Sequence, residues 1–141
     1  MKKSGNRCEF KEHRDSELLD SFLTVLKTSV NIPLRDMYGL AALRPSSRFW
    51  VSEGRAAVVI GAMTRGMMPD NTIPQRREMY EEIYRRVCCM MRENPNLCLT
   101  HAVREVIYQA APQFYLTPKS ARTIIYRARR CRRVLKYIIR N

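Results

Sequence analysis

The chain contains one pattern twice, as FWVSEGRAAVVI at residues 49–60 and as FYLTPKSARTII at residues 114–125. Each copy has two aromatic residues, an aliphatic residue and a hydroxyl residue, followed by apolar residues at helical spacing. Ser and Thr are favoured helix N-caps, because their side-chain oxygen accepts a hydrogen bond from a backbone N–H of the first turn. The pattern therefore predicts two capped helices, each preceded by an aromatic pair.

The similarity extends beyond these segments at the same offset of 65 residues. The aligned residues occupy mostly the expected core and cap positions, including Asn31 with Asn96, Leu34 with Leu99, Leu18 with Ile83, and Leu26 with Met91. Shared apolar spacing of this kind is typical of a repeated supersecondary unit. We therefore predict two related three-helix units in tandem.

Proline, glycine and asparagine residues set the expected boundaries of these units. We predict an all-α fold of about six helices, the first of which starts near Asp15 or Ser16. The expected parts are a flexible basic arm over residues 1–14, a three-helix unit over residues 15–65, a linker over residues 66–74, and a second three-helix unit over residues 75–141 with a long basic C-terminal helix.

The net charge limits the choice of partner. The chain has 26 Lys and Arg residues against 13 Asp and Glu residues, which gives a formal net charge of +13. Such a surplus opposes compaction by self-repulsion, and a polyanionic partner would relieve it. A solubilising role for the surplus is the simpler interpretation, but the charge is concentrated rather than scattered.

The charge is concentrated in the last predicted helix, where residues 119–141 include nine basic residues and no acidic one. At about 100° per residue, one face of this helix carries apolar residues, namely Ile124, Ala128, Cys131, Leu135 and Ile138. The opposite face carries cations, namely Arg122, Arg129, Arg133, Lys136 and Arg140. A ridge of arginines suits bidentate contacts with phosphates or base edges. A solvated face and a helix lying on anionic lipid are the other interpretations.

These observations favour a nucleic-acid-binding accessory or regulatory protein, with DNA and RNA both open as ligands. The candidate binding residues are Arg122, Arg129, Arg130, Arg133, Lys136, Arg140 and Lys119 on the last helix, together with Arg48, Arg55 and the N-terminal arm. The alternative is a helical adaptor or oligomeric interaction protein within a ribonucleoprotein, phage or mobile-element assembly. In that case the basic face would dock on an acidic protein.

The layout of three short helices, with a capped and more basic third helix, is similar to that of helix-turn-helix domains. The resemblance implies that the third helix of a unit enters the major groove of DNA. It covers the order of helices only, because no residue motif of the family is matched. The connections from second to third helix, residues 44–51 and 110–116, are also longer than the tight turn of that family.

The aromatic pairs, Phe49 with Trp50 and Phe114 with Tyr115, have two possible roles. Aromatic rings beside arginines can stack on bases. Their recurrence before both capped helices favours a structural role, in which one ring fills the core and the other fixes the start of the helix. We therefore expect Phe49 and Phe114 to occupy equivalent buried positions.

Metal binding, catalysis and secretion have little support in the sequence. Cys88, Cys89, Cys98 and His101 have a spacing that fits no zinc pattern, and no phosphate-binding glycine loop, nucleophile elbow or carboxylate pair is present. We predict neither an enzyme nor a cofactor. Five cysteines without a C-x-x-C pair indicate a reducing compartment, and no apolar stretch suggests a signal peptide or a membrane span. A cytoplasmic location is therefore expected.

Overall fold

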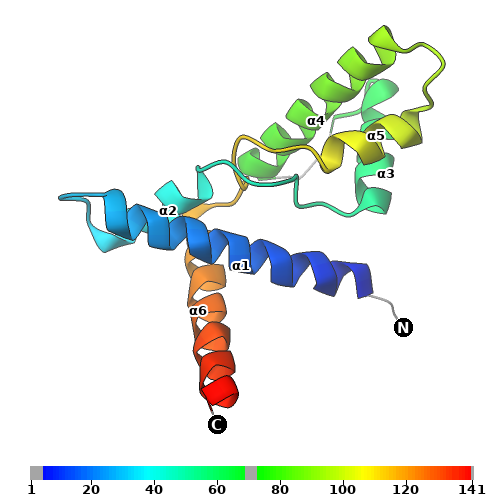
Figure 1. Ribbon diagram of the computed structural model, residues 1–141. Helices are drawn as coiled ribbons and strands as arrows, with labels where there is room; N and C mark the ends of the chain where they lie inside the picture. The colour runs from blue at the N-terminus through cyan, green and yellow to red at the C-terminus, as the bar shows by residue number, and fades with distance from the viewer. Residues whose placement is uncertain (1–4, 69–72, 141) are drawn as a thin grey trace. The chain divides into compact units, whose positions relative to one another are not determined.

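The chain folds into α-helices alone over the part that the computed structural model describes, namely residues 5–68 and 73–140, with side chains over residues 10–68 and 73–139. Figure 1 shows the six helices of this part, and no strand occurs in it. The helices are α1 (Gly5–Thr28), α2 (Leu34–Ala42), α3 (Glu53–Thr64), α4 (Pro74–Glu93), α5 (Leu99–Ile107) and α6 (Pro118–Arg140). The predicted all-α class and the predicted number of helices are confirmed for these residues.

The helices form two compact units, and each unit combines helices from both halves of the chain. Unit 1 comprises Met1–Ser46 and Pro112–Asn141, in which α6 packs against α1 and α2. Unit 2 comprises Ser47–Ala111, in which α3 packs against α4 and α5. The sequence-based division, into residues 15–65 and 75–141, instead assigns each third helix to the pair that precedes it. Relative to that division, the structure exchanges the third helices: α6 packs with α1 and α2, and α3 packs with α4 and α5.

Backbone hydrogen bonds of the long segments that precede α3 and α6 accompany the exchange. The Phe49 N–H donates a hydrogen bond to the carbonyl of Ile107, at the end of α5, over 2.9 Å. The Phe114 N–H donates in the same way to the carbonyl of Ala42, at the end of α2, over 2.8 Å. Each segment is therefore hydrogen-bonded to a helix of the other half of the chain. The helix that follows the segment packs in the same unit as that partner helix.

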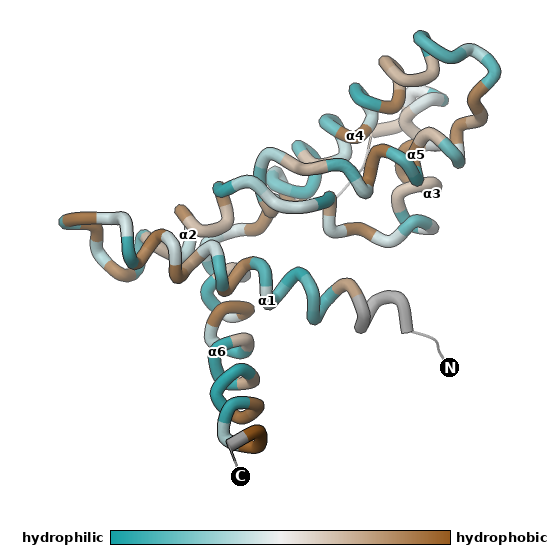
Figure 2. Tube along the Cα trace, viewed as in Figure 1, coloured by the Kyte–Doolittle hydropathy of each residue, from teal (hydrophilic) through white to brown (hydrophobic). Residues whose placement is uncertain are grey.

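The two cores use equivalent residues. Phe49 and Phe114 are buried, with 0% and 3% of their surface exposed, as the sequence predicts. Phe114 belongs to unit 1, as do the largest buried side chains of α1, and Phe49 belongs to unit 2, as do those of α4 and α5. Other fully buried residues occur at matching positions of α3 and α6, namely Ala56 with Ala121 and Ile60 with Ile125. Figure 2 shows the resulting alternation of hydrophobic and hydrophilic residues along the helices.

Both predicted caps of the third helices are present. The Ser52 hydroxyl accepts a hydrogen bond from the Arg55 N–H over 3.2 Å at the start of α3. The Thr117 hydroxyl accepts one from the Ser120 N–H over 3.1 Å at the start of α6. Each cap satisfies a backbone donor that the first turn of a helix leaves without an intrahelical partner.

Helix α1 begins earlier than the sequence suggests. It is helical from Gly5, so residues 5–14 continue the helix where we expect a flexible arm, and residues 1–4 lie outside the described part. Asp15, which lies at the expected start of the helix, is an interior residue of α1 with 8% of its surface exposed. Arg, Lys and Glu are good helix formers, which allows the mostly charged residues 7–14 to extend the helix without an apolar period. Of the predicted linker, residues 69–72 also lie outside the described part.

Candidate nucleic-acid interface

The N-terminal part of α6 is fixed in unit 1 by three buried side chains, Ala121, Ile124 and Ile125. Close contact with α2 is possible because Gly39 has no side chain. A Cβ atom at Gly39 would lie 3.3 Å from Cγ of Pro118, the first residue of α6, which is tighter than ordinary packing. The start of α6 is therefore held directly against α2.

The predicted apolar face of α6 is only partly used in packing. Ile124 is buried and Ala128 is half-buried, but Cys131, Leu135 and Ile138 are exposed. The helix contacts α1 and α2 along its first part, and Figure 1 shows that its C-terminal part extends beyond them. The apolar face that the sequence indicates is therefore packed only over its N-terminal portion. Ala121 and Ile125 also contribute to the core.

Two cations of α6 attach the helix to α1. Arg127 donates to a carboxylate oxygen of Asp15 over 2.7 Å, and Asp15 also receives hydrogen bonds from Arg14. Arg132 donates to Asp20 over 2.9 Å and to the hydroxyl of Ser16 over 2.9 Å. These arginines have a structural role, and neither is among the predicted binding residues. Only the packing of α6 beside α1 identifies their partners, so the sequence alone gives no signal for the pairing.

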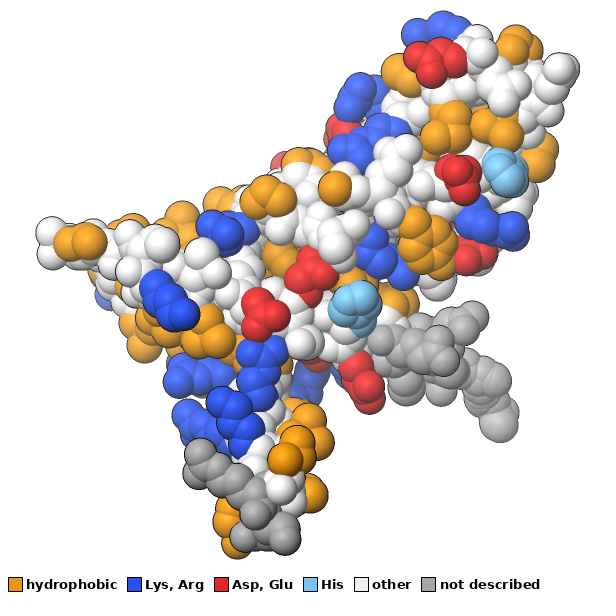
Figure 3. All heavy atoms as spheres, viewed as in Figure 1, with side chains coloured by type: hydrophobic (Ala, Val, Ile, Leu, Met, Phe, Trp, Pro, Cys, Tyr) orange, Lys and Arg blue, Asp and Glu red, His pale blue; other side chains and the backbone are white. Residues whose placement is uncertain are grey.

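The remaining described cations of α6 form what we call the basic face, namely Lys119, Arg122, Arg129, Arg130, Arg133 and Lys136. All are exposed except Arg129, which is half-buried. None of them has a carboxylate within salt-bridge distance in the described part of the chain. The side chain of Arg140, also predicted as a binding residue, lies outside the described residues. Figure 3 shows Lys and Arg side chains gathered along α6, with hydrophobic side chains on its other edge.

Arg122 has a neutral partner, because its guanidinium lies over the ring of Tyr126 at 5.2 Å from the ring centroid. A hydrogen bond with the Tyr126 hydroxyl raises the pKa of Arg122, while hydrogen bonds with Tyr38 and then with Arg122 lower the pKa of Tyr126. The ring orients the guanidinium through a cation–π contact without neutralising its charge. Arg122 therefore remains available to an anion.

The two predicted binding residues outside α6, Arg48 and Arg55, belong to unit 2, whereas the basic face belongs to unit 1. Arg48 donates hydrogen bonds to the carbonyls of Phe49 and Val51, and its guanidinium lies 4.5 Å from the ring centroid of Tyr108. Its partial burial lowers its pKa. Arg48 is thus engaged inside unit 2, while Arg55 is exposed on α3.

The described residues contain no cluster of three His, Cys, Asp or Glu side chains that could hold a metal ion. Cys88, Cys89, Cys98 and Cys131 are free thiols. Among the described helices, none has both the length and the apolar character that crossing a membrane requires. The chemistry that stands out in the described part is therefore a set of cations without anionic partners.

Comparisons with protein-family models, with curated proteins and with solved structures find no significant match to this chain.

Proposed function

We propose that this chain is a nucleic-acid-binding accessory or regulatory protein, and that the basic face of α6 contacts the phosphates. The observation that carries the proposal is the division of the α6 cations into two sets. Arg127 and Arg132 are neutralised by carboxylates of α1, whereas the six cations of the basic face have no such partner in the described residues. A row of like charges on one helix is destabilising unless an external anion compensates it.

A nucleic-acid backbone supplies that compensation over the length of the basic face. The rise of an α-helix is about 1.5 Å per residue, so Lys119 and Lys136 lie about 26 Å apart along the helix axis. Phosphates repeat at about 3.4 Å per strand along duplex DNA, so several of them come within reach of one basic face. Release of the counterions condensed on those phosphates is the driving term for binding.

We propose in addition that the two units are copies of one ancestral three-helix unit and that both are helix-turn-helix-like, with α6 in unit 1 and α3 in unit 2 taking the place of the third helix. The equivalent burial of Phe49 with Phe114 and of Ile60 with Ile125 supports a duplication. The hydrogen bonds from Phe49 to Ile107 and from Phe114 to Ala42 support it further, because donors and acceptors are related by the same offset of 65 residues. On this proposal α6 is the third helix of unit 1, which is the helix that contacts DNA in the helix-turn-helix family.

A second candidate function is that of a helical adaptor in a larger assembly. It is favoured by the exposed hydrophobic side chains on the C-terminal part of α6, where Val134, Leu135, Tyr137, Ile138 and Ile139 are each more than half exposed. Such a cluster commonly marks a protein interaction site. The two functions differ in what they require, because an adaptor would bind a protein most tightly, whereas nucleic-acid binding needs no protein partner.

The proposal is tested by fluorescence anisotropy with the purified 141-residue chain and three labelled probes of equal length, namely duplex DNA, single-stranded DNA and hairpin RNA. Each probe is titrated at five salt concentrations between 50 and 300 mM. We expect binding to at least one probe, with log affinity falling linearly against log salt concentration. The absence of binding to every probe at the lowest salt concentration would refute nucleic-acid binding and leave the adaptor function.

A further inference from the structure

Unit 1 contains a cavity of about 350 Å³ at the start of the basic face, between α2 and α6. Its lining consists of Leu34, Arg35, Tyr38, Pro118, Lys119, Arg122 and Tyr126. The contact between α2 and α6 at Gly39 and Pro118 positions its two walls. The volume lies at the lower end of the range for small-molecule sites, which is about 300–1,000 Å³.

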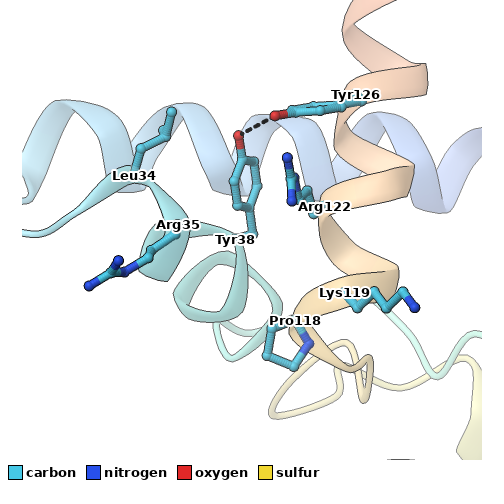
Figure 4. Close-up of a pocket in the computed structure, with 7 residues that line it drawn as sticks. All are labelled: Leu34, Arg35, Tyr38, Pro118, Lys119, Arg122 and Tyr126. Carbon is cyan, nitrogen blue, oxygen red and sulfur yellow. Dashed lines mark hydrogen bonds between the residues drawn. The ribbon is translucent and has the colours of Figure 1, made fainter.

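The charge of the cavity is uncompensated. Three of its seven lining residues are cations and none is acidic, and no carboxylate in the described part of the chain forms a salt bridge with Arg35, Lys119 or Arg122. Figure 4 shows Arg122 beside the two tyrosines, while the side chains of Arg35 and Lys119 point away from Arg122 in opposite directions. Exposed side chains of this length change rotamer within nanoseconds, so both can close over a bound anion.

The two tyrosines add a neutral donor. The Tyr38 hydroxyl donates a hydrogen bond to the Tyr126 oxygen over 3.4 Å, and the two hydroxyls point toward each other in Figure 4. Because the Tyr126 oxygen serves as the acceptor, its own proton remains available to an oxygen atom in the cavity. The rings of Tyr38 and Tyr126 are held edge to face with centroids 5.8 Å apart, which fixes the position of this donor.

We infer that the cavity binds the phosphorylated end of a nucleic-acid strand, with the terminal phosphate between Arg122, Arg35 and Lys119. This inference rests on the proposed function, because the strand would continue from the cavity along the basic face. A terminal phosphate is a monoester with a charge of about −1.5 to −2 at pH 7, whereas each internal phosphodiester carries a single negative charge. Three cations and a hydroxyl donor therefore favour the end of a strand over its interior.

The experiment compares one single-stranded oligonucleotide in three forms, with a 5′-phosphate, with a 3′-phosphate and with hydroxyls at both ends, each labelled away from the end under test. We expect one phosphorylated form to bind at least about tenfold more tightly than the hydroxyl form, because charge-assisted hydrogen bonds are among the strong ones. Arg35→Gln should remove most of this preference, because Arg35 lines the cavity. The variant leaves the basic face intact, because Arg35 lies on α2. The matched control is Arg44→Gln, which removes the same charge from an exposed residue that does not line the cavity.

A second variant, Tyr126→Phe, keeps the ring and removes the hydroxyl donor, and we expect it to reduce the preference several-fold. Equal binding of all three forms by the wild-type chain would overturn the inference and leave the proposed function standing. Binding of a phosphoserine peptide that depends on Arg35, without any preference among strand ends, would overturn it in favour of a protein ligand. If no oligonucleotide binds, the proposed function and the inference fail together. Binding of inorganic phosphate, measured as a shift of the Tyr126 ring resonances in NMR spectra, would not restore either of them.

Discussion

Phe114→Ala should destabilise unit 1 and leave unit 2 folded. The ring is 3% exposed and belongs to the unit that α1, α2 and α6 form, although Phe114 follows α5 in the sequence. Replacing a buried Phe by Ala removes its transfer free energy and leaves a cavity, which together cost about 3–5 kcal/mol. At about 1.4 kcal/mol per tenfold change in an equilibrium constant, unit 1 should open more than a hundredfold more often.

The assay is native-state amide hydrogen exchange, read as peptides by mass spectrometry. Phe114→Ala should accelerate exchange in α1 and α2 while α4 and α5 keep their protection. The reciprocal variant, Phe49→Ala, should accelerate exchange in α4 and α5 while α1 and α2 stay protected. Acceleration of α4 and α5 by Phe114→Ala, with α1 and α2 unchanged, would refute the exchange of third helices, because a unit of three consecutive helices behaves in that way.

Three further predictions concern the contacts within each unit. Asp15→Ala should lower the free energy of unfolding of unit 1 by about 1–3 kcal/mol, because it removes the acceptor of Arg127; an unchanged denaturation midpoint would contradict the structural role of this pair. The hydrogen bond from Tyr108, together with Arg104, lowers the pKa of Glu53 from its ordinary value of 4.5. The stability that Glu53 contributes is therefore fully present above pH 4.5 and is lost as the pH falls through the lowered pKa. Glu53→Gln should flatten the acid side of the profile of stability against pH. An equally steep decline in the variant would contradict this contribution of Glu53. Cleavage at a protease site inserted between residues 68 and 73 should leave both fragments associated on size-exclusion chromatography, since each unit contains helices from both; separation into two folded fragments would speak against the exchange.

Local structure was well predicted from the sequence, but the pairing of helices was not. Hydrophobic periodicity and the hydroxyl residues at Ser52 and Thr117 identify the helices and their caps, because these features depend on neighbouring residues. The identity of the helix that packs against α3 depends on residues far away in the chain. Ala56 and Ile60 are matched by Ala121 and Ile125, so either third helix presents the same buried face to either pair. The sequence pattern is consequently the same for consecutive and for exchanged units.

The candidate site shows the same limit. The concentration of cations on α6 is visible in the sequence, whereas the salt bridges that occupy Arg127 and Arg132 depend on the position of α1. The cavity was not predicted either, since it requires Arg35 and Tyr38 of α2 to lie beside the start of α6. The contacts of Arg48 were not visible in the sequence either, because its guanidinium lies over the rings of Trp50 and of Tyr108, which is far away in the chain.

Phosphate contact by the basic face is tested most directly by the salt dependence of binding in two matched triple variants. The first, Arg129→Gln with Arg133→Gln and Lys136→Gln, removes three charges from the basic face. The control, Arg76→Gln with Arg77→Gln and Arg92→Gln, removes the same charge from exposed residues of α4. If each residue of the first set contacts one phosphate, the slope of log affinity against log salt should become shallower by about two to three units on duplex DNA, at about 0.9 per contact, while the control keeps a nearly wild-type slope. Equal slopes for the two variants would contradict phosphate contact by Arg129, Arg133 and Lys136.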